Sequence, residues 1–261
     1  MDVFSSQLDI FVLVLARMLA IFSVAPGYSG ETLSFFHRIG LSFLIAVILT
    51  PVIEPPEDFA RLASTRYVML VFEQVVIGVF IGFSLTLLFT AFMMAGEFFS
   101  LQMGFSISEV FDPMSQISLP LMGTLMNMVA LLIFFLSNSH LYLIRAVAYS
   151  FEKVPFLPDG FLTSAAYQTG TLQFMVILSS SMFLIALKIA IPVMGTLLLI
   201  SITLGMLGKA APQMNALTMG YPLNLTIGIL ILGWSSPVIV EMMVAQFDIF
   251  FNHLDSVITK F

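Results

Sequence analysis

The stretch FMVILSSSMFLIALKIAIPVMGTLLLISITLGMLG, residues 174–208, decides the fold of this chain. It is longer than the roughly 20 apolar residues that carry a helix across a bilayer, and Lys188 is its one charged side chain. Pro192 lies near its middle, where proline removes a backbone donor and kinks or breaks a helix. We therefore expect a broken helix or a tight hairpin over these residues.

Further apolar stretches, separated by polar, proline or glycine breaks, bring the hydrophobic segments to about six. The chain has 261 residues, of which 59% are hydrophobic and 9% are charged. This composition predicts an all-α integral membrane protein, since soluble domains carry roughly 25% charged residues. The other stretches are residues 10–25, 39–53, 67–95, 121–136 and 223–240.

The lengths of these stretches do not suit a bundle that is bounded only by lipid. The first two fall short of a full crossing, whereas 67–95 would be about 44 Å long as one helix at 1.5 Å per residue. Short pieces, long pieces and breaks favour contact with other protein subunits, because exposed irregular backbone is not tolerated in hydrocarbon. We therefore expect broken helices or hairpins that pack into a hetero-oligomeric assembly.

We expect residues 1–240 to form a single membrane domain and residues 241–261 to form a C-terminal amphipathic helix. This last helix could lie at the membrane interface, bind a partner or simply extend the preceding helix. The distribution of Lys and Arg between the connecting segments predicts a cytoplasmic location for both termini. The same count predicts that residues 96–120 lie on the external side.

Several classes of function are excluded by composition and motifs. The chain has no cysteine, which rules out disulfides and thiolate chemistry, and its net charge of −6 without a basic run argues against nucleic-acid binding. No nucleotide-binding or hydrolase motif occurs, since Gly205-Met-Leu-Gly208-Lys209 lacks the spacing of a P-loop. His37, His140 and His253 are far apart, so we expect no metal site, no cofactor and no enzymatic activity.

Three charged residues lie inside apolar stretches: Arg17, Glu73 and Lys188. An unpaired Arg or Lys at mid-helix costs about 2.5–3.5 kcal/mol, so we expect Glu73 to pair with Arg17 or Lys188. The alternative for Glu73 is a side chain that reaches an interface from the end of its segment. Gly78 and Gly82 form a small-xxx-small pair that would let another helix approach closely.

The segment GEFFSLQMGFSISEVFDPMSQISLP, residues 96–120, reads as neither a membrane helix nor an ordinary solvent loop. It carries no Lys or Arg and mixes aromatic residues with glycines. Met103, Met122 and Met126 lie in or beside it, and flexible methionine side chains can seal an irregular gap and re-pack when it opens. Core packing is the alternative role for each of them. The pattern predicts an element that closes a passage.

The chain resembles the FliR family of flagellar export-gate proteins, which is related to the equivalent subunit of virulence injectisomes. The resemblance spans nearly the whole length. The residues that carry it are Arg17, Phe22 and Pro26, Ile39-Gly40-Leu41, Gly96-Glu97, Gln102-Met103-Gly104-Phe105, Phe111-Asp112-Pro113, Asn138, His140, Arg145, Phe151, the run from Ala186 to Pro192, the run from Gly208 to Asn215, and Gly220-Tyr-Pro222-Leu.

This resemblance implies a subunit of an export gate in the bacterial inner membrane, within the flagellar basal body. The partners it implies are FliP and FliQ, with FlhB attached, and unfolded flagellar proteins are the exported substrates. It also implies a plug in the closed pore, formed by residues of the loop at about 104–120, which we call the plug segment. The implied plug residues are Phe105, Ile107, Val110, Phe111, Asp112, Pro113 and Met114.

Two other functions remain open at this stage: a purely structural anchor of the basal body and a small-solute secondary transporter. The transporter is less favoured, because a proton path needs acids or histidines along it and the apolar stretches offer only Glu73. Contact with membrane lipid is expected in every case.

Overall fold

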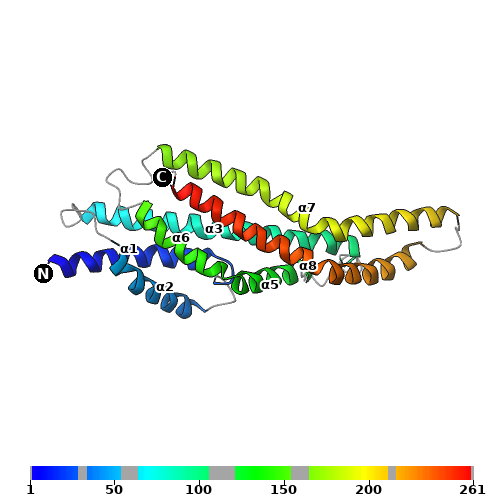
Figure 1. Cartoon of the computed structure of the whole chain (residues 1–261), viewed down its shortest axis with the longest axis horizontal. Coiled ribbons are helices and arrows are strands. Elements are labelled where there is room, and N and C mark those ends of the chain that lie inside the picture. Colours follow the sequence, from blue (N-terminus) through cyan, green and yellow to red (C-terminus); the bar gives the residue numbers. More distant parts are fainter. Residues whose placement is uncertain are drawn as a thin grey trace, which may run out of the picture. The chain divides into compact units, whose positions relative to one another are not determined.

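The computed structural model describes residues 2–28, 34–53, 64–105, 121–153, 165–210 and 216–259. The expected plug residues Ile107, Val110, Phe111, Asp112, Pro113 and Met114 lie outside these ranges. The described residues form helices and turns without a strand (Figure 1). The elements are α1 (Asp2–Val24), α2 (Phe35–Leu49), the short 3-10 helix η1 (Thr50–Val52), α3 (Ser64–Met103), α5 (Leu121–Leu136), α6 (Ser139–Lys153), α7 (Ala165–Ala210) and α8 (Ala216–Thr259).

Within the described part of the chain, five helices are long and apolar enough to cross a membrane, and α5 with α6 makes up to six when counted as one broken span. The expectation of an all-α membrane protein with about six hydrophobic segments is confirmed. The break between α5 and α6 occurs at Asn138, which has a φ of 58°. Asparagine tolerates this left-handed conformation because its short polar side chain bonds locally.

The expected break or hairpin within residues 174–208 is wrong, since α7 runs through Pro192 as one helix. The free-energy cost of one backbone hydrogen bond lost at the proline is smaller than the stabilisation of the continuous apolar helix on both sides of it. Likewise α8 continues through Pro222 and Pro237 to Thr259, so residues 241–259 extend the preceding helix, which was one of the alternatives for them.

The chain divides into two compact units, and α3, α7 and α8 run through both of them. The first unit contains residues 1–88, 138–179 and 249–261, and the second contains residues 89–137 and 180–248. The division into a domain at 1–240 and a separate C-terminal segment stays a prediction.

In the first unit, α1 lies against the first half of α3 at two glycines. A side-chain carbon at Gly78 would lie 2.7 Å from Cβ of Ala20, and one at Gly82 would lie 3.2 Å from Cβ of Val24. Thr86 Oγ1 donates a hydrogen bond to the carbonyl oxygen of Val24 at 3.0 Å. The prediction that Gly78 and Gly82 admit another helix is confirmed, and that helix is α1.

The second unit has a core of phenylalanine rings from α3, α5 and α8. The rings of Phe89, Phe134 and Phe247 lie with their centres 5.5 to 5.7 Å apart, and the centre of Phe92 is 5.4 Å from that of Phe247. Phe92, Phe134 and Phe247 are fully buried. Aromatic pairs in these tilted and edge-on arrangements stabilise beyond the area they bury, by about 0.5–1.5 kcal/mol each. This core holds the helices that flank the plug segment.

Candidate functional site

The plug segment leaves α3 at a turn that the local sequence specifies. The N–H of Gly104 donates to the carbonyl oxygens of Ser100 and Leu101 at 3.1 and 3.2 Å, and the N–H of Phe105 donates to Ser100 at 3.1 Å. This pattern is a Schellman motif, which needs a left-handed residue just beyond the helix, and Gly104 has a φ of 86°. The helix therefore ends where the plug segment was expected to begin.

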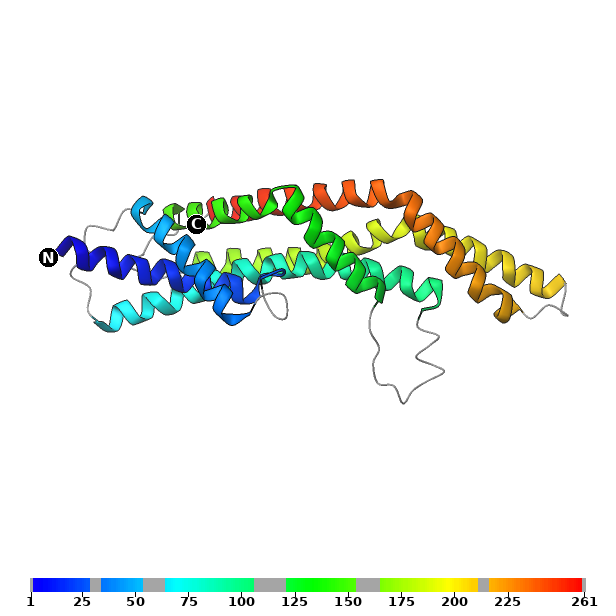
Figure 2. The same ribbon diagram turned by 90° about the horizontal axis from the view of Figure 1, so that it is seen from below.

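The helix α5 follows the plug segment in the chain, and it crosses α3 in close backbone contact (Figure 2). A side-chain carbon at Gly96 would lie 2.7 Å from the carbonyl carbon of Met122 and 2.8 Å from Cα of Gly123. From the other side, a carbon at Gly123 would lie 3.2 Å from the carbonyl oxygen of Met93 and would also meet Glu97 Oε1. The two helices that bracket the plug segment are thus held together at a glycine crossing.

The three expected sealing methionines are buried side chains of this region. Met103 is fully buried at the end of α3, and Met122 and Met126 are buried on one face of α5. Met103 packs against α8, where a side-chain carbon at Gly228 would come within 2.7 Å of its Cγ. Phe105 is half-buried. Their burial fits core packing and sealing alike, so the sealing role stays a prediction.

A cavity of about 350 Å³ opens beside the end of α3 in the second unit. It is lined by Gln102 and Gly104 of α3 and its terminal turn, by Ser201 of α7 and by Tyr221 and Asn224 of α8. Asn224 Nδ2 lies 3.5 Å from Ser201 Oγ, while Oδ1 of Asn224 is buried and has no hydrogen-bond partner among the described residues. Gly104, the first residue of the plug segment, therefore lines a cavity together with polar residues of α7 and α8.

The expected intramembrane charge Arg17 is fully buried in the first unit. Its Nε donates to Gln74 Oε1 at 2.9 Å, another N–H of the guanidinium bonds the same oxygen, and Nη1 donates to Ser150 Oγ at 2.7 Å. The guanidinium carbon lies 3.6 Å from the centre of the Phe151 ring. Arg17 thus joins α1 to α3 and α6 through an amide, a hydroxyl and an aromatic ring.

Arg17 therefore bonds the side-chain amide of Gln74 and not the carboxylate of Glu73 that was expected. Glu73 is buried and lies next to Gln74 on α3. Lys188 is exposed in the second unit, where it lines a cavity of about 290 Å³ with Pro192 and Gln246. A pair between Glu73 and Lys188 stays a prediction. Among the described residues, no group of three or more His, Asp or Glu side chains could hold a metal ion.

Sequence reasoning missed several of these features. Nothing in the sequence marked Gln74, Ser150 and Phe151 as the partners of Arg17; only the charge of Arg17 inside an apolar stretch pointed to this place. The crossing at Gly96 and Gly123 could have been read from two glycines at the facing ends of apolar stretches, since helix glycines permit close backbone approach.

The long apolar helices define an α-helical membrane protein, in which α3 and α5 meet at a close glycine crossing. The family described as "Bacterial export proteins, family 1" matches residues 8–249. The flagellar biosynthetic protein FliR of Escherichia coli K12 is 32% identical over 98% of this chain and 95% of its own length. FliR of Bacillus subtilis 168 is 30% identical over 85% of this chain and 84% of its own length.

The surface presentation of antigens protein SpaR of Shigella sonnei is more distant, at 25% identity over 84% of this chain and 82% of its own length. The chain belongs to the bacterial export proteins, family 1, among its FliR flagellar biosynthetic members. It is a membrane-embedded component of flagellar export.

Proposed function

We propose that this chain is a non-enzymatic subunit of the flagellar protein export gate in the bacterial inner membrane. It assembles with FliP and FliQ homologues, with an FlhB homologue attached, into the pore through which unfolded flagellar proteins leave the cell. The plug segment, residues 104–120, blocks small solutes at rest and is displaced by a substrate chain. The energy for transport comes from other subunits or from the proton gradient.

The observation that carries this proposal is the construction of the two ends of the plug segment. Gly104 ends α3 in a defined turn, and the crossing at Gly96 and Gly123 fixes the start of α5 against the same helix. A connection with anchored ends keeps its position while the residues between them change conformation. The buried methionines beside it suit a closure that re-packs.

The test replaces Phe105 and Phe111 with alanine in the full chain and measures ion leak in cells and assembly of the membrane complex. The double variant is expected to leak ions while it still co-purifies with its partner subunits. Phe98→Ala is the matched control, because Phe98 is also half-buried near the end of α3 but lies outside the plug segment.

Each outcome has a defined reading. Assembled complexes without any leak would refute the plug assignment. Loss of assembly without leak would indicate a structural anchor of the basal body, and loss of one specific uptake activity would indicate a small-solute transporter. A chain that remains a stable monomer in detergent and recovers no FliP or FliQ homologue would refute the gate itself.

A further inference from the structure

The cavity of about 290 Å³ in the second unit lies between α7 and α8 and is open to a ligand. Its wall from α7 is one face of that helix, with residues three or four positions apart: Ile185, Lys188, Ile189 and Pro192. Met242 and Gln246, one turn apart, line it from α8. Apart from Lys188 and Gln246, every lining residue is apolar. The cavity therefore offers one amine and one amide between apolar walls.

The charge of Lys188 is not balanced at this cavity. The side chain is exposed, and within the described part of the second unit it has no hydrogen bond or ion pair. No acidic residue lines the cavity. Lys188 is also the one charged residue of the sequence between positions 160 and 208. An ammonium group in such surroundings is costly unless an anion or water reaches it.

Lipid alone does not cover the exposed face of α7. The apolar span of this helix, Thr169–Ala210, has 42 residues and is about 63 Å long at 1.5 Å per residue. The hydrocarbon of a bilayer is about 30 Å thick, so that even a helix tilted by about 40° has only about 39 Å of its length inside it. Large apolar side chains are nevertheless exposed along the span from Leu172 to Leu207. Part of this face therefore requires a protein surface that covers it.

Lys188 lies near the middle of that span, and both possible surroundings call for the same kind of partner. In hydrocarbon, the ammonium group requires an anion. Outside hydrocarbon, the exposed side chains of Leu184 and Ile191, one turn to either side of Lys188, require an apolar cover. An apolar helix that carries one carboxylate meets both requirements.

We propose that the cavity receives the side chain of an aspartate or glutamate from a helix of another subunit. Its carboxylate accepts hydrogen bonds from Nζ of Lys188 and from the amide nitrogen of Gln246, and charge-assisted bonds of this kind are among the stronger ones in proteins. Its methylene groups lie against Ile189 and Met242, while the rest of the partner helix covers the exposed face of α7. This inference rests on the proposed function in one respect, namely that the chain works in an assembly with other subunits.

The test uses the full chain, co-expressed with the FliP and FliQ homologues and purified as a complex. A water-soluble carbodiimide joins an amine and a carboxyl group that are in contact, forming an amide bond with loss of water and adding no linker. Mass spectrometry of the digested complex is expected to find Lys188 joined to an aspartate or glutamate of a partner subunit. Lys188→Met is expected to lower the amount of co-purified partner about tenfold, because the partner's carboxylate is left without its cation. Lys188→Arg, which keeps the charge, should retain most of it.

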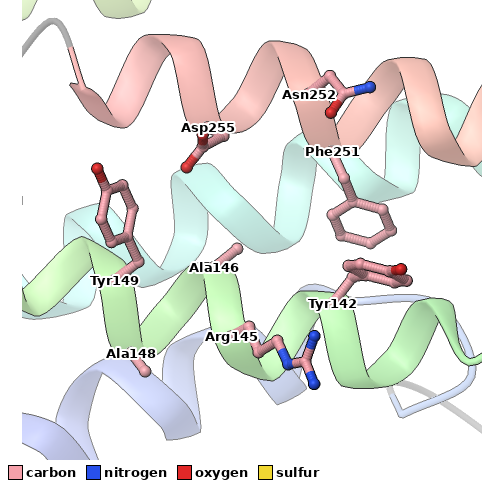
Figure 3. A pocket seen from close by; sticks show the side chains of 8 residues that line it. All are labelled: Tyr142, Arg145, Ala146, Ala148, Tyr149, Phe251, Asn252 and Asp255. Carbon is pink, nitrogen blue, oxygen red and sulfur yellow. The ribbon is translucent and has the colours of Figure 1, made fainter.

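Arg145→Met is the matched control, because it removes an exposed cation from α6 in the first unit. Figure 3 shows the guanidinium of Arg145 turned away from α8. This variant is expected to recover as much partner as the parent chain. Circular dichroism checks that each variant is folded.

A folded Lys188→Met variant that assembles as well as the parent chain would overturn the proposal and leave the proposed gate intact. A parent chain that recovers no partner subunit would refute both. A crosslink from Lys188 to Glu73 of the same chain, or to a second copy of the chain, would also overturn the proposal. So would labelling of Lys188 by an amine-reactive reagent that is as fast in the complex as in the chain alone, since Lys188 would then face lipid or solvent.

Discussion

Substitution of Gly96 by alanine tests the glycine crossing that brackets the plug segment. The new methyl group would lie 2.7 Å from the carbonyl carbon of Met122 and 2.8 Å from Cα of Gly123. Both neighbours are backbone atoms of α5, so no side-chain rotation relieves the contact. Overpacking of this kind costs about 1–3 kcal/mol. Against it stands the gain of about 0.5–1 kcal/mol that alanine brings inside a helix.

The matched control is Gly195→Ala in α7. Gly195 is also inside a long helix of the second unit, and a side-chain carbon there meets no atom within 4 Å. Gly195→Ala changes stability only through the higher helix propensity of alanine. The difference in unfolding free energy between the two variants is therefore the cost of overpacking at Gly96, about 1–3 kcal/mol. We expect Gly195→Ala to raise the midpoint of thermal unfolding and Gly96→Ala to lower it, by about 2–4 °C per kcal/mol.

The assay is thermal unfolding of the full chain in one detergent, followed by circular dichroism. Because the difference between the variants is the measured quantity, detergent effects common to both cancel. If Gly96→Ala proved as stable as Gly195→Ala, the backbone contact between α3 and α5 would not exist as described, and α5 would not be fixed against α3 beside the plug segment.

Three further predictions follow from named contacts. Gly228→Ala is expected to lower the midpoint of thermal unfolding less than Gly96→Ala does, because the atoms that the new methyl group would meet belong to the flexible side chain of Met103; a loss as large as that of Gly96→Ala would contradict this reasoning. Gln74→Leu is expected to cost about 2–4 kcal/mol in urea unfolding, since the buried guanidinium of Arg17 loses its acceptor, and Arg17→Met should recover part of that cost; additive effects would contradict the coupling. Gly104→Val is expected to cost about 1–2 kcal/mol and Gly104→Asn less, because only the second residue tolerates the left-handed conformation; equal effects would argue against the Schellman turn.

Apolar length and spacing predicted the fold class, the number of spans and the helix approach at Gly78 and Gly82, since these depend on local composition. The same reasoning failed at Pro192, because a single lost backbone bond is a local cost while helix continuity is decided by the packing of the whole α7. It also failed at Arg17. Charge balance predicted a carboxylate as its partner. The N–H donors of the guanidinium are instead accepted by the amide of Gln74 and the hydroxyl of Ser150, which come from two other helices.

The nature of the contacts around the plug segment limits how a gate could open there. At Gly96 and Gly123 the neighbours are backbone atoms, so a slide of α5 along α3 would bring Cα positions with side chains into a space that admits only glycine. At Gly228 the neighbour is the flexible side chain of Met103, which can change rotamer at little cost. In the proposed gate, an opening that re-packs Met103 therefore needs less rearrangement than one in which α5 slides along α3.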